Sequence, residues 1–161
     1  MMFVCTTAGC VSDDDPQGSS VGPGDSLPEF SVIMNDGETV SPGSLKGKVA
    51  VIVFFNTDCS DCRKELPVIQ DLWEYYRENE AVKIVTISRQ ESEEEILKYW
   101  QENGLSLPFS PQESKDVYNL FAKSVIPRIY IANKQGIITD NFDDSDMPDL
   151  GKLKAAIDAN L

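Results

Sequence analysis

The sequence predicts one α/β domain with a mixed central sheet and helices on both of its faces. Three observations predict this fold class. Residues 49–55 are seven consecutive apolar residues, mostly β-branched or aromatic, as in a strand buried on both faces of a sheet. Strand and helix patterns alternate after Asp25, which is typical of βαβ units. The chain has 161 residues, a length that suits one domain with a substantial core.

The expected strands begin with a β-hairpin extension at the N-terminal end of the domain. Its turn is Asn35-Asp36-Gly37, because Asp-Gly between two apolar runs is a strong hairpin signal. The last two strands are expected to form a second hairpin around Asn133-Lys134-Gln135-Gly136. In chain order, strands are expected at residues 30–34, 38–40, 49–55, 82–88, 128–132 and 137–142.

Four helices are expected between and after these strands. The first begins at a pair of cysteines and contains Pro67, where we expect a kink. The second opens with Ser92 and Glu95, which have the spacing of a capping box. In the third, the apolar residues Val117, Leu120 and Phe121 are expected to face the core. In chain order, helices are expected at residues 62–79, 92–104, 114–123 and 148–161.

The charge composition excludes several classes of function. The chain has 27 acidic and 14 basic residues, no histidine and a net charge of −13 at pH 7. Binding to a phosphate backbone needs a basic surface, so nucleic acid is not expected as a partner. Catalysis by a Ser-His or Cys-His pair and most catalytic zinc sites need an imidazole. The chemistry is therefore expected to use thiols and carboxylates.

Residues 1–24 are expected to form a leader or flexible segment ahead of the domain at residues 25–161. Thr7-Ala8-Gly9-Cys10 resembles a bacterial lipobox, in which the cysteine is lipidated, and the acidic tract after it resembles an export signal of some Bacteroidetes lipoproteins. Only nine residues precede Cys10 and none is basic, which departs from an ordinary signal peptide. The alternative is a flexible tail with incidental cysteines.

The N-terminal sequence also predicts how the protein attaches to a membrane. No stretch approaches the roughly 18 apolar residues that a spanning helix needs, so an N-terminal lipid at Cys10 is the expected means of attachment. The expected location is the cell envelope outside the cytoplasm, in the periplasm or on the cell surface.

Cys59 and Cys62 are the candidate catalytic residues. They lie three residues apart between a buried strand and a helix. Unpaired backbone N–H groups at a helix N-terminus stabilise a thiolate, and the spacing lets one sulfur reach the other. We therefore expect Cys59 to attack a substrate disulfide and Cys62 to resolve the mixed disulfide. The alternative is a structural pair of buried cysteines.

Metal binding is the other possible use of these residue types. A zinc site would have to recruit Cys5 and Cys10, whose distance along the chain from the pair exceeds that of a zinc ribbon. The acidic residues 143–146 lack the full calcium-loop pattern of an EF-hand. We therefore predict neither a metal site nor a cofactor.

The arrangement of several short motifs resembles the TlpA/ResA-like branch of the thioredoxin family. The resemblance runs from about Asp25 to the C-terminus. It implies a thioredoxin fold and a thiol-disulfide oxidoreductase, periplasmic or membrane-tethered, that reduces disulfides of other proteins and receives electrons from a thiol-disulfide partner. The segments that carry the resemblance are residues 27–32, 36–37, 45–49, 54–67 and 125–138.

The resemblance also assigns roles to individual residues. Pro127 matches a cis-proline that faces the two sulfurs, and Ile126 matches a residue whose backbone binds an extended substrate. Glu65 matches a glutamate that lies near the thiols and influences their proton affinities. Without the resemblance, Pro127 reads as a trans proline at a strand edge and Glu65 as an ordinary helix carboxylate.

Two acidic residues depart from the pattern of the family. Asp58 and Asp61 stand where most relatives have tryptophan and often proline. Carboxylates close to the pair disfavour thiolate and modulate the titration of the cysteines, which predicts a dithiol at the reducing end of its family. Val53 occupies the position of the thioredoxins' buried acid, so proton transfer is expected to fall to Glu65 or to solvent.

Two other functions remain as alternatives. Peroxiredoxins share this fold, but their frame has threonine or serine three residues before the cysteine, where this chain has Asn56. A tethered binding module would keep the fold for protein contacts and use the cysteine pair as a structural disulfide.

Overall fold

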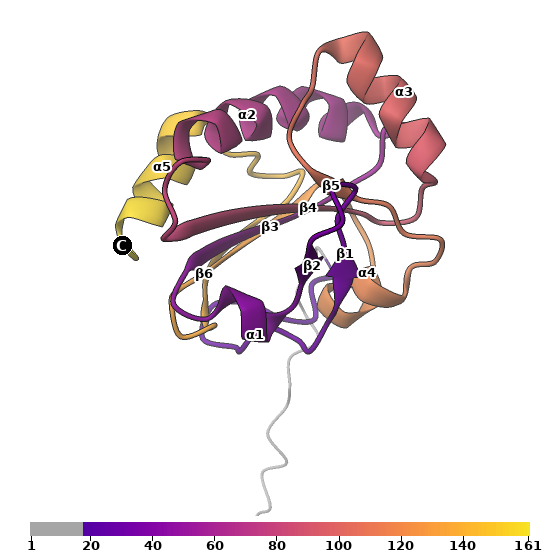
Figure 1. The fold of residues 1–161 in the computed structure, drawn as a ribbon. Helices are drawn as coiled ribbons and strands as arrows, with labels where there is room; N and C mark the ends of the chain where they lie inside the picture. Colours follow the sequence, from indigo (N-terminus) through magenta and orange to yellow (C-terminus); the bar gives the residue numbers. More distant parts are fainter. Residues whose placement is uncertain (1–17) are drawn as a thin grey trace, which may run out of the picture.

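The computed structural model describes residues 18–161, which form a mixed five-stranded sheet covered by helices (Figure 1). The strand order is β5-β4-β3-β6-β7. The central strand β3 pairs in parallel with β4 and antiparallel with β6, and β5 and β7 lie at the two edges. The strands of this sheet are β3 (Val49–Phe55), β4 (Val82–Ser88), β5 (Phe109–Ser110), β6 (Arg128–Ala132) and β7 (Ile138–Phe142).

The central strand is where the sequence predicted it. All seven residues of β3 are buried, as expected for a strand with neighbours on both edges and helices on both faces. Its last two side chains lie in aromatic clusters: Phe54 contacts Tyr118 and Phe121, and Phe55 contacts Trp100. This packing holds the end of β3, after which the candidate active site begins.

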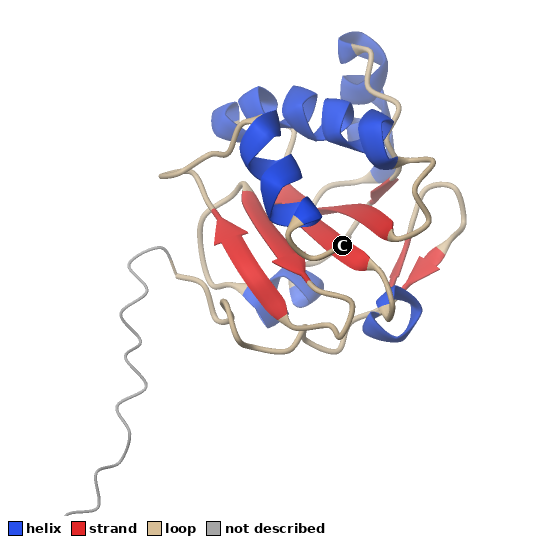
Figure 2. Ribbon diagram, turned by 90° about the vertical axis from the view of Figure 1, so that its left-hand side faces the viewer, coloured by secondary structure: helices blue, strands red, loops and turns tan. Residues whose placement is uncertain are grey.

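Five helices complete the described part of the chain. In Figure 1, α2 and α5 lie over one face of the sheet with α3 beside α2, and α1 and α4 lie on the opposite side. Figure 2 shows the same arrangement from the side. Among residues 18–161, no helix is long and apolar enough to cross a bilayer. The helices are α1 (Pro42–Leu45), α2 (Ser60–Tyr76), α3 (Glu93–Asn103), α4 (Asp116–Phe121) and α5 (Leu150–Asp158).

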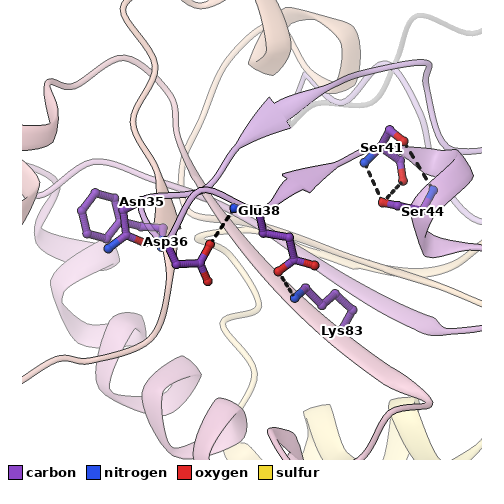
Figure 3. Close-up of polar contacts among 7 residues, drawn as sticks. Asn35, Asp36, Glu38, Ser41, Ser44 and Lys83 are labelled. Carbon is purple, nitrogen blue, oxygen red and sulfur yellow. Dashed lines mark hydrogen bonds and ion pairs between the residues drawn. The ribbon is translucent and has the colours of Figure 1, made fainter.

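The predicted N-terminal hairpin forms a separate two-stranded sheet, β1 (Val32–Ile33) and β2 (Thr39–Val40). Its turn is attached to the edge strand β5, because the Phe109 N–H donates to Asn35 Oδ1 at 2.9 Å. Glu38 forms an ion pair with Lys83 of β4 (Figure 3). These contacts explain how a hairpin with so few paired residues is ordered against the larger sheet.

The capping signals predicted for α3 are present, and a similar one opens α1. Ser92 and Glu95 form a reciprocal capping box, and α3 ends at Gly104, which has φ 66°. Ser41 and Ser44 form the same kind of box at α1 (Figure 3). The sequence analysis did not predict α1, which is only four residues long.

The helix α4 differs from its prediction in length and in the side chains it buries. It covers residues 116–121 rather than 114–123. Leu120 was expected to face the core, and this was wrong, because its side chain is 44% exposed. Tyr118 is buried instead and packs edge-on against Phe54. In so short a helix the apolar pattern covers less than two turns, so tertiary contacts decide which face is buried.

Residues 18–24 lie against the domain, although we assigned them to the leader. The Ser20 N–H donates to the Phe121 carbonyl at 2.8 Å, and the Gly24 N–H donates to the Ile138 carbonyl at 2.8 Å. The Ser19 hydroxyl is 2.8 Å from that of the buried Tyr130. These backbone groups thus pair with α4 and with the outer edge of β7, and the domain boundary at residue 25 stays a prediction. Cys5 and Cys10 lie outside the described residues.

Candidate active site

The two candidate cysteines lie at the junction of β3 and α2. Cys59 is the N-cap of α2, and its Sγ accepts a hydrogen bond from the Cys62 N–H at 3.2 Å. Cys59 is partly exposed, whereas the Cys62 side chain is fully buried. Both are free thiols. A partly exposed sulfur at the positive end of a helix, with a second thiol behind it, is suited to nucleophilic attack followed by internal resolution.

The loop before β6 faces Cys59. The Cys59 thiol donates to the carbonyl oxygen of Ile126 at 3.6 Å. The peptide bond between Ile126 and Pro127 is cis. The structure thus brings Cys59, Ile126 and Pro127 together, although 67 residues separate Cys59 from Ile126.

Two buried side chains that the sequence analysis did not single out hold this loop. Val125 has φ 72°, a left-handed conformation that is unusual for a β-branched residue. The Tyr118 hydroxyl donates to the Val125 carbonyl at 2.8 Å. The guanidinium of Arg128 donates to the Ser124 carbonyl through Nε at 2.9 Å and Nη2 at 2.7 Å. Such support is required where a backbone conformation is unfavourable.

Glu65 lies on α2 one turn beyond Cys62. Its side chain is 4% exposed, and its Oε1 has no hydrogen-bond partner among residues 18–161. Burial, and secondarily the charge of Asp149, raise the pKa of Glu65 to about 7. A buried carboxyl that titrates near neutral pH can accept and release a proton during thiol chemistry.

Burial is also the main influence on Cys62. It raises the pKa of the Cys62 thiol well above its usual range, and the neighbouring Cys59 adds to this increase. A backbone contact with Asn56 and the positive charge of Arg89 act in the opposite direction. Cys62 is therefore protonated at neutral pH and must lose its proton before it can attack.

The two acids that depart from the family pattern lie at the rim of the site. Asp61 is in the first turn of α2, and its carboxylate is 3.5 Å from Lys64 Nζ in an exposed ion pair. Asp58 is exposed. Burial raises the pKa of Glu91, and the charge of Asp58 contributes to this increase.

A contact between two loops fixes the segment before Cys59. The buried Glu91 accepts hydrogen bonds from both the N–H and the hydroxyl of Thr57. The Arg63 Nε donates to the Thr57 carbonyl. All polar groups of Thr57 therefore have partners, which restricts the loop that carries Cys59. Sequence reasoning missed Glu91, because it follows Thr57 by 34 residues and belongs to no recognisable motif.

A comparison with known protein families identifies the family of this chain. Residues 23–141 match the AhpC/TSA family. The chain belongs to this family. Its relatives include the thiol-disulfide oxidoreductase ResA of Bacillus anthracis, 24% identical over 117 residues, which cover 73% of this chain and 67% of the relative. ResA of Oceanobacillus iheyensis is 29% identical over 121 residues, which cover 73% and 62% of the two chains. The AhpC/TSA chain thus spans about two thirds of the length of these relatives.

Solved structures agree with this assignment. A putative protein disulfide isomerase from Bacteroides thetaiotaomicron has a TM-score of 0.79 and 25% identity, covering 89% of this chain and 90% of its own. A putative thioredoxin from Neisseria meningitidis has a TM-score of 0.70 and 27% identity, covering 87% and 91%. The predicted thioredoxin fold and ResA-like family are therefore confirmed, and this AhpC/TSA-family protein is a thioredoxin-like thiol-disulfide oxidoreductase.

The peroxidase frame and metal binding can both be compared with the site. Asn56, at the position where the peroxidase frame has a hydroxyl, exchanges hydrogen bonds of 3.4 and 3.5 Å with the backbone of Gln90. Its amide is thus directed to the neighbouring loop. Among residues 18–161, no three side chains of histidine, cysteine, aspartate or glutamate gather in a group that could hold a metal ion.

Proposed function

We propose that this protein reduces disulfide bonds of other proteins in the cell envelope through Cys59 and Cys62. The observation that carries the proposal is the pairing of a partly exposed thiol at a helix N-terminus with a fully buried thiol one turn later. The nearby carbonyl of Ile126 supports it, because an extended substrate segment can pair with the backbone of that loop.

The reaction proceeds in two exchange steps. The Cys59 thiolate attacks one sulfur of the substrate disulfide, forming a mixed disulfide and releasing the first substrate thiolate. The Cys62 thiolate then attacks Cys59 Sγ, which forms the Cys59–Cys62 disulfide and releases the second substrate thiolate. Two electrons pass to the substrate, whose two thiolates take up protons. Glu65 accepts the proton of Cys62, because its buried carboxyl has a pKa of about 7 and an unpaired oxygen.

The direction proposed for the reaction depends on the acidic rim. Asp58 and Asp61 disfavour thiolate, which makes the reduced form less stable and the protein a better reductant. Equilibration with glutathione is therefore expected to give a potential well below the roughly −120 mV of strong oxidants such as DsbA. A potential near that value would contradict the proposed direction.

The proposed location and partners follow from the chemistry and the N-terminal sequence. Each turnover leaves Cys59 and Cys62 oxidised, so a thiol-disulfide partner must supply two electrons. Cys10 is proposed as the lipidated residue of a leader, which attaches the domain to a membrane outside the cytoplasm. Mass spectrometry of the mature N-terminus tests this assignment.

A trapping experiment tests the proposed function. Cys62→Ser is expected to hold substrates as mixed disulfides at Cys59, because the resolving thiol is absent. Substrates are identified by mass spectrometry after capture from the native compartment. Cys59→Ser is the matched control and should capture none. Recovery of no Cys59-linked protein, together with no insulin reduction by the unmodified protein, would instead favour a binding module with a structural disulfide.

A further inference from the structure

Glu91 holds the segment that leads into Cys59. It lies in the loop between β4 and α3, and its side chain is 7% exposed. One carboxylate oxygen accepts a hydrogen bond from the Thr57 N–H at 2.9 Å, and the other accepts one from the Thr57 hydroxyl. Thr57 precedes Cys59 by two residues. A buried carboxylate of one loop therefore binds the backbone of another loop just before the attacking thiol.

Further hydrogen bonds fix both partners of this contact. The Glu91 N–H donates to the Gln112 carbonyl at 2.9 Å, and the Glu91 carbonyl accepts from the Ser88 hydroxyl at 3.4 Å. On the other side, the Arg63 Nε donates to the Thr57 carbonyl. The contact between Glu91 and Thr57 is thus connected to the end of β4, to the segment after β5 and to the start of α2, and such a connected polar network is rigid.

The carboxylate of Glu91 is not explained by stability alone. None of the ion pairs found in residues 18–161 involves Glu91. A buried carboxylate without an opposite charge is costly, and a neutral side chain could accept a hydrogen bond from the same N–H at a lower cost. A polar group of this kind beside a reactive site is therefore a candidate for a role in the reaction.

The position of the Cys59 sulfur is what the loop determines. Cys59 Sγ accepts from the Cys62 N–H at 3.2 Å and donates to the Ile126 carbonyl at 3.6 Å. The sulfur thus lies between the start of the helix that carries the second thiol and the loop proposed to bind the substrate. An intramolecular step depends strongly on the geometry of the reacting atoms, and a displacement of about 1 Å can slow it by up to about a hundredfold.

We propose that Glu91 positions Cys59 for the second exchange step by holding Thr57 and thereby the loop that carries the sulfur. The inference rests on the proposed function and deepens it by adding a residue to the resolution of the mixed disulfide. In that step Cys62 gives its proton to Glu65 or to solvent, and its sulfur displaces the substrate thiolate from Cys59. Glu91 acts through Thr57 and is a positioning residue rather than a catalytic one.

The two exchange steps can be measured separately with the aromatic disulfide DTNB as the substrate. The reduced protein releases one coloured thiolate when Cys59 attacks and a second when Cys62 resolves, and only the second step is unimolecular. Glu91→Leu is similar in size but lacks both hydrogen bonds to Thr57, and it is expected to slow the second phase about fivefold or more. The first phase should change less than about threefold, because a partly exposed sulfur stays accessible to a small disulfide in solution.

Two further variants separate positioning from charge and from stability. Glu91→Gln should keep the second phase within about twofold of the original rate, because its amide can accept from the Thr57 N–H and donate to the Thr57 hydroxyl. Gln70→Leu is the matched control. Gln70 is also 7% exposed, and its Oε1 accepts from the N–H groups of Ser106 at 2.9 Å and Leu107 at 3.0 Å, in a loop that carries no cysteine. This control should change neither phase.

The outcomes distinguish this inference from the proposed function. A ratio of the two phases that is the same in Glu91→Leu and in the original protein overturns the role of Glu91 alone. A second phase slowed equally in Glu91→Leu and Gln70→Leu also overturns it, because a general loss of stability then explains the effect. Equal slowing in Glu91→Leu and Glu91→Gln overturns it as well, because the charge is then responsible. Absence of a second phase in the original protein contradicts the proposed function itself.

A variant of the partner residue keeps the test available if Glu91→Leu does not fold, which circular dichroism checks. Thr57→Val removes the hydroxyl contact and leaves the backbone contact in place. It is expected to slow the second phase about twofold or more relative to the first. An unchanged ratio of the two phases in folded Thr57→Val would then overturn the inference.

Discussion

At the scale of single residues, two buried polar groups in the described part of the chain lack full hydrogen bonding. Glu65 Oε1 and Arg89 Nε are the buried side-chain atoms that lack a partner in residues 18–161. One is acidic and lies on the helix that carries Cys62, and the other is basic and lies on the sheet side. Polar groups left in this condition reduce stability and are typical of functional sites.

The stability of the protein is expected to depend on pH through Glu65. Its pKa is about 7 in the folded protein and near 4.5 when unfolded, so the folded state binds more protons between these values. The free energy of unfolding therefore falls as the pH rises from about 4.5 to 7, and the loss is complete above 7. Between pH 5 and 8 the original protein should lose on the order of 2 kcal/mol of unfolding free energy through this group, and Glu65→Gln should not. Urea unfolding at each pH measures the difference.

The comparison needs a control for other titrating groups. Glu78 is also a glutamate, but its side chain is 93% exposed. Glu78→Gln should therefore leave the pH dependence of the free energy of unfolding unchanged. An identical loss of stability in Glu65→Gln and in the original protein would show that Glu65 is already ionised at pH 5 in the folded state.

Sequence reasoning at this scale depends on local spacing. The spacing of Cys59 and Cys62 and the turn that follows place both thiols and Glu65 on the start of one helix. The contact of Thr57 with Glu91 joins residues 34 positions apart, and strand pairing holds the Arg89 backbone beside Phe55 at the end of β3. No local pattern marks these residues, because only the folded sheet brings the ends of β3 and β4 together.

At the scale of elements, the start of α2 combines two opposing requirements. The N-terminal end of a helix stabilises negative charge, whether on the Cys59 sulfur or on Asp61 in the first turn. A carboxylate there strengthens the helix, but it also opposes a second negative charge nearby. We therefore expect Asp61 to favour both the helix start and the proposed reducing direction.

Substitution of Asp61 separates these two effects. Asp61→Asn is expected to make the reduction potential less negative by about 10–30 mV, since loss of the carboxylate favours the thiolate form. The same variant should lose about 0.3–1 kcal/mol of stability from the helix start. Glutathione equilibration and thermal unfolding measure the two quantities. A more negative potential in Asp61→Asn would contradict the proposed role of the acidic rim.

The long strands were predictable, whereas the short strand β5 and the short helix α1 were not. The strands β3, β4 and β6 have the bounds that the sequence indicated, because each segment is rich in the β-branched and aromatic residues that favour strands. The strand β5 has two residues and was not predicted. Its place is set by pairing with β4 and by the contact with Asn35, which are tertiary contacts. The predicted kink at Pro67 stays a prediction, and α2 runs from Ser60 to Tyr76 with Pro67 inside it.

At the scale of the whole molecule, the excess of acid is the dominant property. The net charge of −13 at pH 7 produces a negative field around the protein, which adds to the acids at the rim of the site. Such a field increases the encounter rate of cationic partners and decreases that of anionic ones, and salt screens it over about 10 Å at 0.1 M.

The reduction rate is therefore expected to depend on the charge of the substrate. With about 20 mM salt, a cationic peptide disulfide should react about three- to tenfold faster than an anionic one of matched length. Raising the salt to about 500 mM should lower the rate for the cationic peptide and raise the rate for the anionic one, until the two rates are similar. A neutral peptide is the control. Equal rates at low salt would show that the field does not reach the reacting sulfurs.

The unequal exposure of the two sulfurs also has a consequence for oxidative damage. An oxidant from solvent meets Cys59 first, because Cys62 is fully buried. Oxidation of Cys59 to a sulfenic acid places that group beside the Cys62 thiol, and the two condense to a disulfide with loss of water. This reaction competes with further oxidation to the sulfinic and sulfonic acids, which are not readily reversed. The buried thiol is thus expected to protect the exposed one, because early damage becomes the same disulfide that the proposed thiol-disulfide partner reduces to two thiols.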